Sequence, residues 1–192
     1  MEEAPRQGLG SFFRALTAFL DQRGLREQVR AAVSPSTREL IDQPPRPLSF
    51  IPSRPIDELE NALQNIAGVQ ACVDCGVACA RPLGWSLLQP VLRMVFQLFG
   101  QSPEPVFANL DRFFSLVTRG ISFSWEREPA ERRGTVLARF AGEDTPEAAF
   151  HVLRGTLLFA FEVSSTSGEV GAPEVVESTA SATIVRFQVQ WR

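Results

Sequence analysis

Three cysteines form the sharpest local pattern in the sequence, because they follow the spacing Cys72-x-x-Cys75-x-x-x-Cys79. Thiolates at this spacing can converge on one zinc ion or one iron–sulfur cluster. The three match the last three positions of a bacterial four-cysteine cluster run, although the first position of that run is not a cysteine here. A zinc site would need a fourth ligand, for which His151 and Asp74 are candidates. We therefore take Cys72, Cys75, Cys79 and His151 as candidate metal ligands.

The same three cysteines also fit a plainer explanation. On a helix, positions 72, 75 and 79 share one face, and free cysteine often packs in protein cores as a small hydrophobic residue. Redox chemistry of neighbouring thiols is a third alternative. The odd number of cysteines, three, is typical of a protein whose thiols stay reduced in the cytosol. The sequence leaves core packing, metal binding and redox chemistry open.

Catalytic chemistry has few candidate groups in this chain. It contains one histidine, His151, and neither lysine nor tyrosine, which excludes lysine nucleophiles and tyrosine acid–base groups. Any Ser-His-Asp or Cys-His arrangement would have to use His151. Active sites usually hold several titratable groups with perturbed pKa values. We therefore favour a non-catalytic role over an enzymatic one.

Phenylalanine is abundant, with 15 residues, and many of them stand at helical spacing. Aromatic clusters of this kind most often belong to a core. They can also line a dry apolar cavity that takes a small ligand. Both interpretations place the phenylalanines inside the fold, between the elements that the sequence predicts.

Two periodicities divide the chain into a helical front half and a strand-rich back half. Apolar residues at helical spacing predict helices over residues 9–20, 25–33, 55–66, 85–99, 106–117 and 145–162, with a short helical turn at 36–41. Alternating apolar and polar residues predict strands over 121–126, 136–139, 175–176 and 183–191. The small apolar residues of 68–81 fit neither pattern cleanly.

This order of elements predicts an α+β fold, with N-terminal helices packed on a small, mostly antiparallel C-terminal sheet. We expect one domain over residues 1–192, because its length suits a single core. Within it, residues 1–8 are polar and predict a frayed tail. Residues 42–55 are rich in proline and predict an extended crossing loop.

Charge and hydropathy limit the classes of partner and the cellular compartment that we expect. The net charge is −3 and no basic block is present, so nucleic acid is not an expected partner. No run of about 18 uninterrupted apolar residues occurs, so no membrane span is expected. The first apolar stretch has no cationic segment before it, unlike a secretory signal. We therefore expect a cytoplasmic protein.

From residue 81 onward, the order of motifs resembles a bacterial family of unknown function of about 200 residues. The resemblance rests on Arg81-Pro82 followed by Trp85, Gly100-x-Ser102-Pro103-Glu104-Pro105, Arg154-Gly155 and Val185-x-Phe187-x-Val189-x-Trp191. In layout this family is similar to vinyl-reductase-type sensor domains and to the haem nitric-oxide-binding fold. The haem-binding relatives use a Tyr-x-Ser-x-Arg signature. This chain departs from that signature because it has no tyrosine.

The resemblance implies a non-catalytic sensory or interaction domain, with an apolar ligand pocket between helices and sheet and with a homodimer as one option. On this basis we take Trp85, Phe96, Phe113, Phe114 and Arg154 as candidate ligand-binding residues. The identity of any cofactor stays open.

The sequence therefore favours a regulatory binding domain for a small apolar ligand or a protein partner. The first alternative is a metalloprotein that holds Zn or an Fe–S cluster through its cysteines. The second alternative is a structural subunit of a larger complex.

Overall fold

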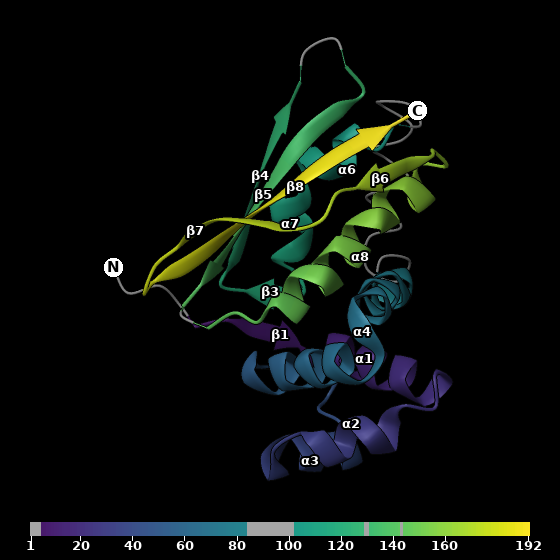
Figure 1. The fold of residues 1–192 in the computed structure, drawn as a ribbon, viewed down its shortest axis with the longest axis vertical. Helices are drawn as coiled ribbons and strands as arrows, with labels where there is room; N and C mark the ends of the chain where they lie inside the picture. Colours follow the sequence, from purple (N-terminus) through teal and green to yellow (C-terminus); the bar gives the residue numbers. More distant parts are fainter. Residues whose placement is uncertain (1–4, 84–101, 129–130, 143) are drawn as a thin grey trace.

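The structure is a computed structural model that describes residues 5–83, 102–128, 131–142 and 144–192. Its helices are α1 (Gly10–Gln22), α2 (Arg26–Ala32), α3 (Pro35–Asp42), α4 (Arg54–Leu83), α6 (Glu104–Ala108), α7 (Leu110–Phe114) and α8 (Glu147–Val163). Its strands are β1 (Gln7–Leu9), β2 (Phe50–Pro52), β3 (Thr118–Arg119), β4 (Ile121–Arg127), β5 (Arg133–Ala141), β6 (Gly168–Val170), β7 (Glu174–Ser178) and β8 (Ala182–Trp191). The predicted α+β class is confirmed, with helices in the front half and the larger sheet at the C-terminal end (Figure 1).

The first three helices form because each has a clear start or stop signal and an apolar face. In α1, Phe13, Leu16 and Leu20 recur at helical spacing and are fully buried. Gly24 ends this region with a positive φ of 66°, which a glycine adopts without steric cost. The hydroxyl of Ser34 caps α3 by accepting a hydrogen bond from the backbone N–H of Thr37.

The long helix α4 is broken at Gly68, whose φ of 81° and ψ of 176° are not helical. Among the described residues, α4 alone is long and apolar enough to cross a membrane by length and composition. Gly68 divides it into two parts, and neither reaches the roughly 20 residues that a membrane span needs. Its apolar residues pack instead in the core, including Leu59 and Leu63, both fully buried. We therefore interpret α4 as a core helix.

The larger sheet is antiparallel, with strand order β4-β5-β8-β6, and β7 also pairs with β8. Along β8, alternate residues such as Val185, Phe187 and Val189 are buried, as its period-2 pattern predicts. The helix α8 packs against the sheet, where the rings of Phe140 and Phe150 lie 5.2 Å apart between centroids. The short helices α6 and α7 join the same apolar cluster.

A small three-stranded sheet connects the two halves of the chain, with strand order β2-β1-β3. In it Gln7 pairs with both Pro52 and Arg119. Residues 7 and 8 therefore lie in a strand, and the prediction of a frayed tail over 1–8 is wrong for them. The physical reason is that β1 finds its hydrogen-bond partners far away in the sequence. The proline-rich segment 42–55 contributes β2 and includes the first residues of α4, and its role as a crossing loop stays a prediction.

Two apolar clusters form the interior, and α4 and α8 hold them together. The helical core lies among α1 to α4, and the sheet core lies among α6, α7, α8 and the larger sheet. The two helices cross at Gly76 and Gly155. A Cβ atom at Gly155 would lie 2.0 Å from the carbonyl oxygen of Val73, so only glycine permits this close approach. The extent of the domain over 1–192 stays a prediction.

Candidate functional site

A cavity of about 150 Å³ lies between the helices and the larger sheet, where both clusters meet. The helix α4 contributes Ile56, Asp57, Glu60, Ala80 and Leu83 to its wall. From α6 and α7 come Val106, Leu110, Phe113 and Phe114, and α8 contributes Ala149, Val152, Leu153, Thr156, Leu157, Phe159 and Ala160. Residues of β1, β3, β4 and β5 complete it, together with Arg6, Phe12, Ser53 and Val117. The wall is therefore apolar over most of its area, with few polar groups.

The charged residues of the wall are Arg6, Asp57 and Glu60, which we call the polar corner. The Arg6 guanidinium donates two hydrogen bonds to the Asp57 carboxylate, at 3.2 and 2.8 Å. Both side chains of this ion pair are mostly buried. Burial raises the pKa of Asp57, although the nearby Arg6 charge acts in the opposite direction. Bidentate pairing fixes the Arg6 fork and uses two of its five N–H donors on Asp57.

Glu60 is the unusual member of the polar corner. The residue is only 3% exposed, and no described residue forms a hydrogen bond with its carboxyl group. Burial, and next the negative charge of Asp57, raise the pKa of Glu60 well above its usual range, while Arg6 lowers it. Buried polar side chains are nearly always hydrogen-bonded, because leaving one unpaired costs about 1–3 kcal/mol. The cavity therefore contains one carboxyl group without a protein partner among the described residues.

The predicted ligand-binding residues fall in three different places. Phe113 and Phe114 line the cavity, and the Phe114 ring packs on Phe123 with centroids 4.4 Å apart. Arg154 lies outside the wall, because its Nε donates a 2.8 Å hydrogen bond to the carbonyl oxygen of Val170 and so joins α8 to β6. Trp85 and Phe96 lie outside the described residues. The binding roles of these residues stay predictions.

The polar corner itself was not predicted from the sequence. Glu60 follows Ile56 by four residues and precedes Leu63 by three, so it stands on the apolar face of its helix. This charged residue within an apolar stripe was the one sequence signal that could have indicated a buried polar site. Nothing in the sequence brings Arg6 to this face, because it reaches Asp57 only through the strand pairing of β1.

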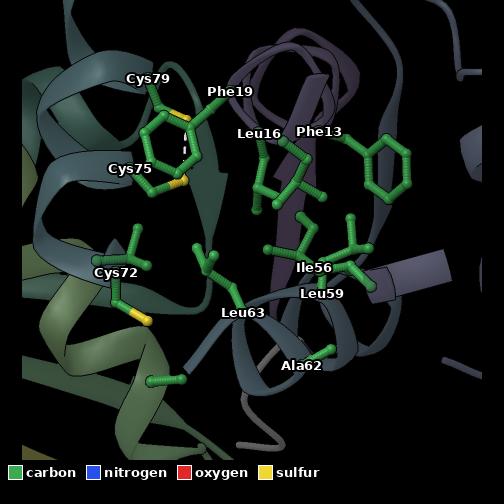
Figure 2. Packing of buried hydrophobic residues seen from close by; sticks show 14 of the residues in the cluster. Phe13, Leu16, Phe19, Ile56, Leu59, Ala62, Leu63, Cys72, Cys75 and Cys79 are labelled. Carbon is green, nitrogen blue, oxygen red and sulfur yellow. Dashed lines mark hydrogen bonds between the residues drawn. The ribbon is translucent and has the colours of Figure 1, made fainter. Parts of the chain in front are cut away.

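All three cysteines are buried in the helical core (Figure 2). Cys75 and Cys79 lie one turn apart on α4, beside Phe19, with their sulfur atoms 3.8 Å apart. The thiol of Cys72 donates a 3.8 Å hydrogen bond to the backbone carbonyl of Glu60, across the break at Gly68. The thiols are free.

The environment of Cys72 and Cys75 opposes the ionisation of their thiols. Burial raises the pKa of Cys72 to about 12, with a smaller contribution from the charge of Glu60. The hydrogen bond between the Cys75 and Cys79 thiols, followed by burial, raises the pKa of Cys75 well above its usual value. Metals and nucleophilic reactions both require the thiolate. The cysteines therefore pack as small hydrophobic residues, as their shared helical face allows.

The described residues do not support the predicted metal set of Cys72, Cys75, Cys79 and His151, whose metal-binding roles stay a prediction. Across the described ranges, no group of three or more His, Cys, Asp or Glu side chains is placed to hold a metal ion. The Nε2 atom of His151 lies 3.2 Å from Glu147, one turn earlier in α8. Its Nδ1 atom is buried with no partner among the described residues. Helical periodicity places the three thiols on a face of α4 that packs in the apolar core.

Comparisons with known proteins identify the fold and leave the sequence family open. No family model and no curated protein matches the sequence. Among solved structures, the chain is similar to the Fe(II) unliganded H-NOX protein mutant A71G from K. algicida, with TM-score 0.70, 13% identity and 96% of each chain covered. It is also similar to an oxygen-binding H-NOX domain related to soluble guanylate cyclases, with TM-score 0.64 and 10% identity over 95% of this chain and 94% of that one. The predicted likeness to the haem nitric-oxide-binding fold is therefore confirmed: the chain has the fold of H-NOX domains.

Proposed function

We propose that this chain is a non-catalytic sensory or regulatory domain that binds a small, mostly apolar ligand in the cavity between α4, α7 and α8. The observation that carries the proposal is the cavity itself, which is lined by apolar side chains and lies inside a fold shared with ligand-binding domains. One of the similar structures is an oxygen complex of an oxygen-binding H-NOX domain. An apolar pocket with few polar groups is the usual form of a small-molecule site.

The size of the cavity limits the ligand. An engineered apolar cavity of about 150 Å³ in another protein stays dry and takes benzene or xenon. The cavity here has a similar volume, about 150 Å³. Ligands of drug size occupy pockets of about 300–1,000 Å³. The expected ligand is therefore no larger than one six-membered ring with a small substituent.

Haem does not fit the described residues of this cavity. The similar structures include an Fe(II) H-NOX protein and one from work on heme distortion in the H-NOX family. Haem iron in proteins is held by His, Cys, Met or Tyr. No described residue of the wall is of these types. His151 lies outside the wall and contacts Glu147, and the cysteines face the helical core. We therefore propose that the ligand contacts the protein wall directly.

A ligand in this cavity would act on the packing of two helices. Both α4 and α8 contribute to the wall and approach each other closely at Gly76 and Gly155. A ligand that binds only the folded state stabilises it by RT ln(1 + [L]/Kd), which is about 2.7 kcal/mol at a concentration of 100 Kd. Occupancy would therefore stabilise the contact between the helical core and the sheet core.

Thermal unfolding with toluene tests this function. The wild type should unfold at a higher temperature as toluene is added, because the folded state alone contains the cavity. In Leu110→Trp the added indole should occupy the cavity and abolish the shift. Val29→Phe is the matched control, since it overpacks the helical core away from the wall. A wild type whose unfolding temperature does not respond to toluene would contradict the proposal.

A second experiment tests the direct contact of ligand and wall. Haemin mixed with the purified protein should give the spectrum of free haemin. A stoichiometric Soret band would contradict this expectation, and its loss in His151→Ala would identify His151 as the iron ligand.

A further inference from the structure

The unpaired carboxyl group of Glu60 indicates what kind of ligand the cavity takes. Glu60 lies in the cavity wall, is 3% exposed and receives no hydrogen bond from a described residue. Substituting an apolar side chain at this position would remove the cost of burying the group. A polar group held at the surface of an otherwise apolar pocket usually fixes the orientation of a ligand.

The charges around Glu60 narrow the chemistry of that ligand. Arg6 and Asp57 neutralise each other through two hydrogen bonds. An anionic ligand would therefore meet the negative field of Asp57 without a free cation from the polar corner. A cationic ligand would need Glu60 to be ionised in an apolar environment, which burial and Asp57 both oppose. A neutral ligand avoids both costs.

We propose that the ligand is a small neutral molecule with an apolar body and one hydrogen-bond acceptor, such as a carbonyl oxygen, to which Glu60 donates its acid proton. This inference rests on the proposed function and adds the chemical class of the ligand. In this arrangement the carboxylic acid obtains the hydrogen bond that the protein does not supply. Phe113 and Leu157 contact the apolar body from the two helices on either side of the cavity.

Three probes of equal ring size separate the ligand classes: cyclohexane, cyclohexanone and cyclohexylamine, which is a cation at neutral pH. Their affinities for the full chain can be measured by titration with methyl and carboxyl NMR detection. The ratio of cyclohexanone affinity to cyclohexane affinity should be about tenfold higher in the wild type than in Glu60→Leu, because both proteins share the cost of dehydrating the ketone and only the wild type supplies the hydrogen bond. The carboxyl carbon signal of Glu60 should shift with cyclohexanone and stay unchanged with cyclohexane.

Two variants of Glu60 test which group provides the selectivity. Glu60→Leu should bind cyclohexane as well as the wild type does and should lose about tenfold in cyclohexanone affinity, since leucine has no donor. Glu60→Gln keeps a donor in its amide group and should retain the preference for cyclohexanone. Glu27→Leu removes an exposed carboxylate of α2 outside the wall and is the matched control. It should leave both affinities unchanged.

The possible failures are distinguishable. If the ratio of cyclohexanone to cyclohexane affinity is the same in the wild type and in Glu60→Leu, the role of Glu60 is overturned while the cavity function stands. If cyclohexylamine binds most tightly and Glu60→Gln abolishes that binding, the ligand is a cation and the inference is also overturned. If none of the probes binds, the proposed function itself fails.

Discussion

The close crossing of α4 and α8 at Gly76 and Gly155 yields the sharpest prediction about stability. A methyl group at Gly155 would lie 2.0 Å from the carbonyl oxygen of Val73, whereas real contacts of this kind stay above 3.0 Å. The helices must therefore separate locally by about 1 Å. Overpacking typically costs about 1–3 kcal/mol, and backbone atoms cannot rotate away, so the upper end applies. Alanine recovers about 1 kcal/mol through its helix propensity. We expect Gly155→Ala to lower the free energy of unfolding by about 2 kcal/mol.

A double-mutant cycle shows whether helix separation is the cause. A Cβ atom at Gly76 would lie 1.9 Å from the carbonyl oxygen of Val152, so Gly76→Ala should cost a similar amount. Once one methyl group has separated the helices, the second should cost less, and the double variant should fall short of additivity by more than about 0.5 kcal/mol. Urea unfolding measures each free energy. Losses below about 0.5 kcal/mol for the single variants, or strict additivity, would refute the reasoning.

Three further predictions follow from Glu60, Gly68 and the thiols. Because the pKa of Glu60 is raised above its usual value of 4.5 in the folded state, stability should fall as pH rises above 4.5, by up to about 1.4 kcal/mol per pH unit. Glu60→Gln should remove that decline. Urea unfolding from pH 5 to 8 measures the free energy of unfolding of both proteins, and the same change with pH in the wild type and in Glu60→Gln would contradict this prediction. Gly68→Ala should lower the free energy of unfolding by about 1–3 kcal/mol. Backbone strain alone is the cause, because Gly68 has a positive φ and no atom lies within 4 Å of the added methyl group. A variant that unfolds at the same temperature as the wild type would contradict this. With its pKa at about 12, Cys72 should be roughly one part in ten thousand thiolate at pH 8. Thiol labelling should then wait for unfolding, and rapid labelling of the folded protein would show otherwise.

The sequence predicted those elements whose pattern is carried by neighbouring residues. The helix expected over 9–20 is α1 (Gly10–Gln22), and the strand expected over 183–191 is β8 (Ala182–Trp191). In both, large apolar side chains mark one face without interruption, so periodicity alone is enough. The confirmed α+β class follows from the same patterns.

Other features depend on partners that the local sequence does not reveal. The helix expected over 106–117 is divided at Asn109 into α6 and α7. The segment 68–81 continues α4 beyond Gly68, because small residues let it lie close against α8.

The candidate site was predictable only in part. Phe113 and Phe114 stand in the wall, as an apolar pocket between helices and sheet would require. The polar corner was missed because Arg6 reaches Asp57 through a pairing of distant strands. The cysteine pattern pointed to a metal because spacing on a helix suits both a ligand set and a packed face. Only the burial of the cysteine side chains in the structure favours the packed face over the ligand set.

The placement of β1 has a consequence for the order of events during synthesis on the ribosome. Gln7 and Gly8 line the cavity, yet their strand needs Arg119 and Thr118 as neighbours on one side. The front helices can emerge and begin to associate, but the cavity cannot close around a ligand until β3 and then α8, up to Ala160, have left the exit tunnel. In a shorter nascent chain the apolar wall of the cavity would be incomplete and open to water. Binding of a small molecule should therefore begin only late in translation.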